Sequence, residues 1–412
     1  MKRIIALLLS LVMVFALVAC GQKEEPAKTE EPAKTEEPAK TEEPKTDAEP
    51  IVIGMYASQT GSSAKNTVFQ VNAAKMAMEE INAAGGINGR PLDMILYDDA
   101  STPEGAVKAV TRLIENDGVD AIIGGIMSPN IAACKDITEN AKVLHIGAGT
   151  GVAWTNIGAK YLFRGTVSAA LPIASLLDTM VDAGMKAPAL MSSSTEYGQS
   201  GRDTILAGLE SRPLELKADI VYQATDTDYT GQIAQVISSG CDCVIQYGDS
   251  AELTLILRQL RQAGYTGLVF TVEGAGDRNV IEIAGPAADG VVFCCAYIVP
   301  PTVEESTSEL MEKVLTNYVD TYGELPQQDT VFRGYDQMYL VAEALKNSAD
   351  PEERDANREA FINIKGFEGL AGTYDFSDES GDGLTKSNTY MILDGKHQAY
   401  DLDAINAWLA EQ

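Results

Sequence analysis

Residues 50–55 read PIVIGM, and residues 71–86 read VNAAKMAMEEINAAGG. The first run is short, apolar and β-branched, as in a buried strand, and the second has helical spacing of apolar residues before two glycines. Further strands are expected over residues 92–97, 121–124 and 142–146, and helices over residues 103–116 and 131–140. This alternation predicts an α/β fold in which helices cover parallel strands.

The same alternation begins again after residue 186. Strands are expected over residues 187–191, 215–221, 243–247 and 268–272, and helices over residues 200–210, 229–238 and 252–263. Residues 51–412 are therefore expected to form two lobes of the same kind, as their length also suggests. Periodicity does not assign the next segments to either lobe, namely a strand over residues 291–298 and helices over residues 304–322 and 330–346.

The N-terminal residues are typical of an export signal. Lys2 and Arg3 precede an apolar run over residues 4–19, which ends in Leu-Val-Ala directly before Cys20. The run is short for a transmembrane helix, so we interpret residues 1–19 as a signal peptide. The segment is similar to a bacterial lipoprotein signal, which implies lipidation of Cys20. We therefore expect an extracytoplasmic protein that is lipid-anchored to the cell membrane.

Residues 20–50 contain a short repeat of low complexity. The unit Glu-Glu-Pro-Ala-Lys-Thr starts at Glu24, Glu30 and Glu36, and a truncated copy starts at Glu42. Such a segment cannot bury a core. We predict a disordered tether after Cys20, with a span of roughly 30 Å by the random-coil relation.

The composition excludes several function classes. The net charge of −29 argues against a nucleic-acid partner. The six cysteines include Cys20, so an odd number remains and no complete disulfide framework follows. We interpret four of these, in apolar strand-like runs, as small buried residues: Cys241, Cys243, Cys294 and Cys295. No histidine or cysteine stands at zinc-ligand spacing, so we expect neither a metal nor a cofactor.

An enzyme is the weaker reading of the glycine- and serine-rich loops. Residues 143–154 read VLHIGAGTGVAW, but the third glycine comes one position early for Gly-x-Gly-x-x-Gly and the run follows the fourth strand. The serines at 192–194 lack the Gly-x-Ser-x-Gly elbow, and only two histidines could serve as a base. We assign His145 to the strand. An extracellular serine hydrolase that uses Ser192 stays as an alternative.

A binding protein needs only polar groups in the loops at the carboxyl ends of strands. A zwitterionic amino acid requires donors for its carboxylate and an anion for its ammonium group. Ser128 and Thr150 follow the third and fourth strands of the first lobe, and Glu273 follows a late strand of the second lobe. A site with one half on each lobe couples ligand binding to lobe closure.

Several motifs occur in the order found in one known family. They are IVIG at 51–54 with Thr60-Gly61, INAAGGING at 81–89, YDD at 97–99, GVD at 118–120, FRGT at 163–166, EYG at 196–198, LRQ at 257–259 and VEG at 272–274. Residues 51–299 resemble the exported solute-binding proteins of branched-chain amino acid transporters, and weaker similarity continues to residue 393.

The resemblance implies two Rossmann-like lobes of the periplasmic-binding-protein type I fold, with the ligand in the cleft between them. Three crossover strands would form the hinge, near residues 166–170, 297–300 and 373–376. The expected lobes are residues 51–168 plus 299–374 and residues 169–298 plus 375–412. Carried over by position, Ser128 and Thr150 meet the ligand carboxylate, and the carbonyl of Ala148 helps to hold the ammonium group. Glu273 is its charge partner, and Tyr197 is a wall of the pocket.

The sequence departs from the family at the side-chain pocket. Asp249 stands where the family often has a tyrosine, and Lys65 or Asn66 stands in place of another. If Asp249 faces the cleft, a second carboxylate beside Glu273 favours a polar or cationic ligand side chain. Alternatively, Asp249 caps the helix that contains Glu252.

The resemblance also implies the partners. The protein would act as a non-enzymatic monomer that delivers an amino acid to an ABC permease driven by a cytoplasmic ATPase. The ligand would be a branched-chain amino acid or a related, more polar one. A ligand-sensing lipoprotein for another small carboxylate or amide is the alternative within binding proteins.

Overall fold

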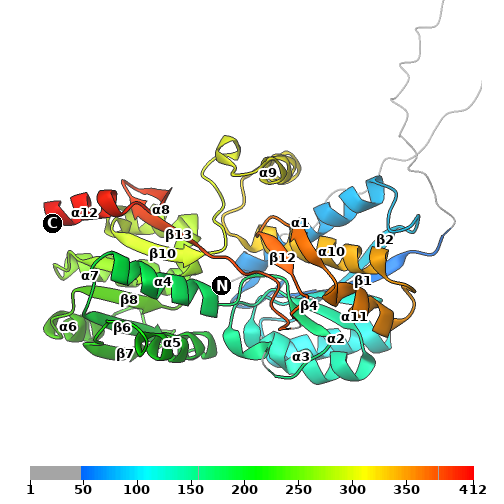
Figure 1. Ribbon diagram of the computed structural model, residues 1–412, viewed down its shortest axis with the longest axis horizontal. Coiled ribbons are helices and arrows are strands. Elements are labelled where there is room, and N and C mark those ends of the chain that lie inside the picture. Colours follow the sequence, from blue (N-terminus) through cyan, green and yellow to red (C-terminus); the bar gives the residue numbers. More distant parts are fainter. Residues whose placement is uncertain (1–47, 156, 379) are drawn as a thin grey trace, which may run out of the picture. The chain divides into compact units, whose positions relative to one another are not determined.

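The computed structural model describes residues 48–155, 157–378 and 380–412 (Figure 1). The predicted signal peptide, Cys20 and most of the tether lie outside these residues. Among the described helices, none is long and apolar enough to cross a membrane. Two large sheets organise the described chain, and we call each sheet with its helices a lobe.

The first lobe is built on a parallel sheet with the strand order β2-β1-β3-β4-β5. The strands are β1 (Ile51–Ala57), β2 (Leu92–Asp98), β3 (Ala121–Gly124), β4 (Leu144–Gly147) and β5 (Leu162–Arg164). Its helices are α1 (Ala64–Ala83), α2 (Pro103–Glu115), α3 (Ser128–Ala141), α9 (Glu309–Tyr322), α10 (Thr330–Asn347) and α11 (Arg354–Ile362).

Both faces of this sheet are buried, which explains its continuous apolar strands. Ile53 and Met55 of β1 pack in the core that contains α1 and α10. Tyr56 points to the opposite face and packs with α2 and α3. The sequence-based prediction of helix-covered parallel strands is therefore confirmed in this lobe.

The second lobe repeats this topology. Within the order β14-β13-β10-β9-β8-β6-β7, the run β10-β9-β8-β6-β7 is parallel and connected like the first sheet, and β13 and β14 are antiparallel additions. The strands are β6 (Pro188–Ser193), β7 (Ala218–Tyr222), β8 (Cys243–Tyr247), β9 (Leu268–Thr271), β10 (Val291–Cys295), β13 (Asn388–Leu393) and β14 (Lys396–Ala399). The helices are α4 (Ala170–Asp182), α5 (Glu196–Leu209), α6 (Thr230–Ser238), α7 (Ser250–Gln262), α8 (Arg278–Ala284) and α12 (Leu402–Glu411).

Four cysteines were interpreted as small buried residues, and the structure confirms this interpretation. Cys243, Cys294 and Cys295 are buried in strands β8 and β10, and Cys241 is partly buried. All are free thiols. Burial raises the pKa of Cys294 to about 11, so this thiol stays protonated at neutral pH.

Helices α9 and α10 belong to the first lobe. The periodicity of the sequence did not assign them to either lobe. Glu80 of α1 accepts hydrogen bonds from Lys313 Nζ (2.7 Å) and Tyr335 OH (2.9 Å). The helix predicted over residues 304–322 is interrupted, because Ser308 caps α9 by accepting from the backbone N–H of Met311 (3.1 Å). A short 3-10 turn, Val303–Glu305, precedes it.

The chain passes between the lobes three times, and the third passage comes later than we predicted. We expected the first lobe to end at residue 374, but Phe376 and Leu384 belong to its core. The ring of Phe376 contacts Phe163 (6.0 Å between centroids) and Phe361 (4.4 Å). This aromatic cluster holds the segment to the first lobe until shortly before β13. The segments at 166–170 and 297–300, which the resemblance implies to be crossover strands, contain no strand: residues 166–169 and 297–300 have no regular secondary structure, and α4 begins at Ala170.

Helices α1 and α10 cross in close contact at Gly334. A Cβ atom on Gly334 would lie 2.0 Å from the carbonyl oxygen of Gln70. We expect Gly334→Ala to lower the free energy of unfolding by about 1–3 kcal/mol, because two rigid backbones would have to separate. Urea unfolding will measure the loss. The control is Gly231→Ala in α6, where no atom lies within 4 Å of the added Cβ; it is expected to be neutral or stabilising.

Candidate ligand-binding site

The loop at residues 148–151 follows β4 and presents two free backbone donors. All four of its carbonyl groups accept hydrogen bonds from the protein. The donors are Arg333 Nη1 to Ala148 (3.0 Å), Trp154 Nε1 (3.1 Å) and Arg164 Nη1 to Gly149, Ala169 N to Thr150 (2.7 Å) and Arg164 Nη2 to Gly151 (2.9 Å). Among the described residues, no acceptor meets the N–H groups of Gly149 and Thr150. The loop can therefore bind an acceptor such as a carboxylate.

Ser128 lies beside this loop at the start of α3. Its Oγ accepts a hydrogen bond from the N–H of Gly151 (3.0 Å). Glycines in this loop could serve to let a ligand approach the backbone closely, but here Ser128 lies against them. A Cβ on Gly149 or Gly151 would lie 2.8 or 2.7 Å from Ser128 Oγ. The glycines thus allow α3 to approach the loop.

Glu273 connects the two lobes. It follows β9, and its Oε1 accepts hydrogen bonds from Thr150 Oγ1 (2.7 Å) across the cleft and from Tyr197 OH (3.0 Å). Glu273 Oε2 is buried and has no hydrogen-bond partner. Burial and the charge of Glu273 raise the pKa of Tyr197, so its hydroxyl remains a donor at neutral pH. The structure therefore brings together three residues that the sequence placed in the site.

Tyr197 also forms part of an aromatic pair. Its ring lies 4.8 Å from that of Tyr247, and the hydroxyl of Tyr247 is buried without a hydrogen-bond partner. Sequence reasoning missed Tyr247, although it is the last residue of a strand that we predicted.

Asp249 lies at the start of a helix, as expected from the alternative that it caps the helix containing Glu252. It is the N-cap residue of α7, and its N–H donates to Glu252 Oε2 (2.9 Å). The Asp249 side chain is exposed. The capping interpretation is therefore confirmed, and a contact of Asp249 with the ligand stays a prediction.

Arg333 of α10 was missed by sequence reasoning. It is only 7% exposed, and it binds Asp329 Oδ2 through Nε (3.0 Å) and Nη2 (2.6 Å). Burial lowers the pKa of Arg333, but the charges of Asp329 and Glu273 outweigh burial and leave that pKa raised. Arg333 therefore lies near Glu273. Together these three side chains carry one net negative charge, which a single ligand cation can neutralise.

A cavity of about 180 Å³ lies between the lobes. Ser128 and Trp154 line it from the first lobe, and Tyr197, Glu196 and Ser200 line it from the second. Of the six predicted binding residues, Ser128 and Tyr197 thus face this cavity. Ala148, Thr150, Asp249 and Glu273 are not part of its lining.

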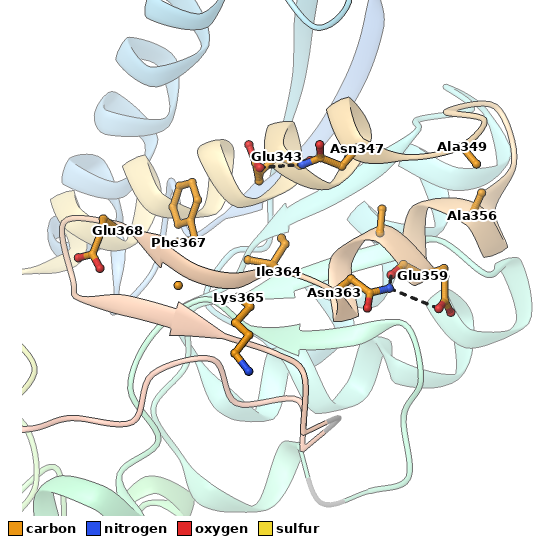
Figure 2. A pocket seen from close by; sticks show the side chains of 12 residues that line it. Glu343, Asn347, Ala349, Ala356, Glu359, Asn363, Ile364, Lys365, Phe367 and Glu368 are labelled. Atoms are coloured by element: carbon orange, nitrogen blue, oxygen red, sulfur yellow. Dashed lines mark hydrogen bonds between the residues drawn. The ribbon is translucent and has the colours of Figure 1, made fainter.

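A larger hollow, of about 680 Å³, lies in the first lobe among α10, α11 and β11 (Lys365–Glu368), which pairs with β12 (Thr373–Asp375) (Figure 2). Its polar side chains bind one another: Asn347 donates to Glu343 Oε1 (2.7 Å) and to the Glu343 carbonyl. No predicted site residue lines this hollow, so it does not define the ligand site.

The hydrolase alternative does not fit the structure. Ser192 is fully buried in β6. His145 is buried in β4 beside Tyr56 OH (3.0 Å), and burial lowers the pKa of His145 to about 3. His397 Nε2 instead contacts the carbonyl of Ala275 (2.7 Å). Among the described residues, no group of three or more potential ligands could hold a metal ion.

The fold and the site define a two-lobed, ligand-binding protein with polar groups on both sides of an interlobe cleft. A family model described as periplasmic binding protein matches residues 50–396, and the chain belongs to this family. The family consists of extracytoplasmic binding proteins of transporters, so the chain is not an enzyme.

Named relatives and solved structures agree with this assignment. The leucine-, isoleucine-, valine-, threonine- and alanine-binding protein of Pseudomonas aeruginosa is 29% identical over 313 residues, which cover 74% of this chain and 81% of that protein. The leucine-specific-binding protein of Salmonella typhimurium is 31% identical over 254 residues, covering 60% and 67%. The leucine-binding protein LivK of Thermotoga maritima has the same fold, with a TM-score of 0.76 at 23% identity over 85% of this chain and 98% of that one.

Proposed function

We propose that this protein captures an α-amino acid in its interlobe cleft. One observation carries the proposal: a loop with two free N–H groups is hydrogen-bonded across the cleft, through Thr150, to a carboxylate with an unpaired buried oxygen. Free donors on one lobe and a free acceptor on the other match the two charged ends of a zwitterion.

The proposed roles follow from these contacts. The N–H groups of Gly149 and Thr150 and the hydroxyl of Ser128 bind the ligand carboxylate. Glu273 Oε2 binds the ammonium group. The carbonyl of Ala148 already accepts from Arg333 and can offer only its second lone pair to the same ammonium. Glu273, Asp329 and Arg333 together carry one net negative charge, which favours binding of one positively charged group, the ligand ammonium.

The ligand side chain is the next element of the proposal. By their names, the Salmonella typhimurium relative binds leucine, and the Pseudomonas aeruginosa relative binds leucine, isoleucine, valine, threonine and alanine. Tyr197 and Trp154 give the cavity an aromatic wall. Asp249 and Arg333 add charged groups to the region. We therefore propose a branched-chain amino acid or a related, more polar one.

Delivery to an ABC importer completes the proposed function. The protein would act as a monomer that closes its two lobes around the ligand and presents it to a permease driven by a cytoplasmic ATPase. Lipidation of Cys20 would keep it at the membrane, with the tether up to residue 50 as a spacer. The hydrogen bond between Thr150 and Glu273 supports the closing motion, because it joins residues of different lobes.

Titration calorimetry will test the ligand class. The panel should contain the common L-amino acids, and each hit should be compared with its carboxamide and its des-amino acid. We expect at least one amino acid to bind, and loss of either charged end to weaken binding by about 100-fold, since each end is a charged group that the protein holds by hydrogen bonds. A des-amino acid or carboxamide that binds as tightly as its parent would contradict the proposal.

A further inference from the structure

Arg164 is a buried arginine with no exposed surface, at the end of β5. Its guanidinium group donates to Asp382 Oδ1 (2.6 Å), to the carbonyls of Gly149 and Gly151, and to Thr155 Oγ1 (3.1 Å). It also stacks on the ring of Trp154, 4.2 Å from the centroid. Because a buried charge without partners is costly, this complete set of contacts indicates a fixed guanidinium position.

The contacts of Arg164 and Arg333 determine how the loop presents its donors. In a trans peptide, the carbonyl of one residue and the N–H of the next point to opposite sides. Arg333 holds the carbonyl of Ala148, which shares a peptide plane with the N–H of Gly149. Arg164, together with Trp154 Nε1 (3.1 Å), holds the carbonyl of Gly149, which shares a plane with the N–H of Thr150. Each free N–H thus points away from the arginine that holds its plane.

We propose that Arg164 and Arg333 are positioning residues that orient the N–H groups of Thr150 and Gly149 toward the carboxylate of the ligand. Arg164 acts through the loop, because its own side chain is not accessible. This inference rests on the proposed function. It also gives a role to the segment just before the third interlobe passage, since Asp382 of that segment holds Arg164, and Gly381 O accepts from the N–H of Arg164 (2.8 Å).

The test is the selectivity of Arg164→Lys for an amino acid over its carboxamide. Lysine keeps the charge but cannot hold two carbonyls and Asp382 in one plane. We expect the variant to lose affinity for the amino acid by about 10- to 30-fold, as for a lost hydrogen bond to a charged group. Its affinity for the carboxamide should change much less, so the ratio of the two dissociation constants falls.

Arg212→Lys is the matched control. Arg212 also binds one carboxylate, Asp178 (2.7 Å), and two carbonyls, those of Gly208 (2.9 Å) and Ala174 (3.2 Å), but it lies away from the loop. This control should leave both dissociation constants unchanged. If Arg164→Lys does not fold, Asp382→Asn replaces it, because it keeps Arg164 and removes its charge partner; the same selectivity loss, at about threefold or more, is expected.

The outcomes separate the two proposals. Equal losses for the amino acid and the carboxamide, or no loss, would overturn the positioning role and leave the proposed function intact. Failure of the unmodified protein to bind any amino acid would overturn both.

Discussion

Replacing Glu273 by glutamine will weaken amino-acid binding by about 100-fold or more. The ligand ammonium group then loses the one buried carboxylate that we propose as its partner. Glutamine keeps an acceptor for Thr150 and Tyr197, which now bind Glu273 Oε1. The melting temperature of the ligand-free protein should therefore change little. Titration calorimetry and thermal unfolding on the same sample will measure both effects.

Glu196→Gln is the control for this prediction. Glu196 is an exposed carboxylate that lines the interlobe cavity, which Glu273 does not line. Its replacement by glutamine changes the net charge by the same amount. We expect this variant to bind normally. Unchanged binding in Glu273→Gln would show that Glu273 is not the ammonium partner, and a large loss of stability would show that its role is structural.

Asp336→Asn will lower the free energy of unfolding by about 2–4 kcal/mol. The buried carboxylate of Asp336 accepts from the N–H groups of Leu370 (2.7 Å) and Ala371 (2.8 Å) and from Tyr374 OH (3.0 Å). In either orientation, the amide NH₂ of asparagine faces a backbone N–H and leaves it unpaired. Urea unfolding will measure the loss, and Asp320→Asn on the exposed face of α9 should stay within about 0.5 kcal/mol.

The pH dependence of stability gives a second measurement at Asp336. Burial raises the pKa of Asp336 from 3.8 to about 6, although the backbone N–H groups and Tyr374 act in the opposite direction. The folded protein therefore holds a proton between about pH 4 and pH 6 that the unfolded chain releases. This group makes stability fall as pH rises through that window, by up to about 1.4 kcal/mol per pH unit. The slope should be shallower in Asp336→Asn; equal slopes in both proteins would contradict this.

Most strands and helices could be predicted from the sequence, because each is a local pattern, but β5 and β14 were not. β3 and β8 match the predicted ranges, and the site residues were found because ligand loops follow the carboxyl ends of strands. Helix α4 was missed, since its nearly continuous apolar run, ALPIASLL, shows no clear helical face. The late end of the first lobe depends on Phe376 packing against Phe163, a contact that only the folded chain creates.

The two arginines of the site show why the rest could not be predicted. Arg333 reaches the carbonyl of Ala148 from a helix 185 residues later, and Arg164 reaches Asp382 over 218 residues. Local periodicity contains no information on such contacts. The pair Asp329 and Arg333, four residues apart at the start of an otherwise largely apolar helix, was the only available signal.

A crystal structure with the tightest-binding amino acid tests the central claim most directly. We expect the ligand carboxylate within hydrogen-bond distance of the N–H groups of Gly149 and Thr150, and its ammonium group on Glu273 Oε2. A carboxylate bound to the guanidinium group of Arg333, or a ligand outside the interlobe cleft, would contradict the account.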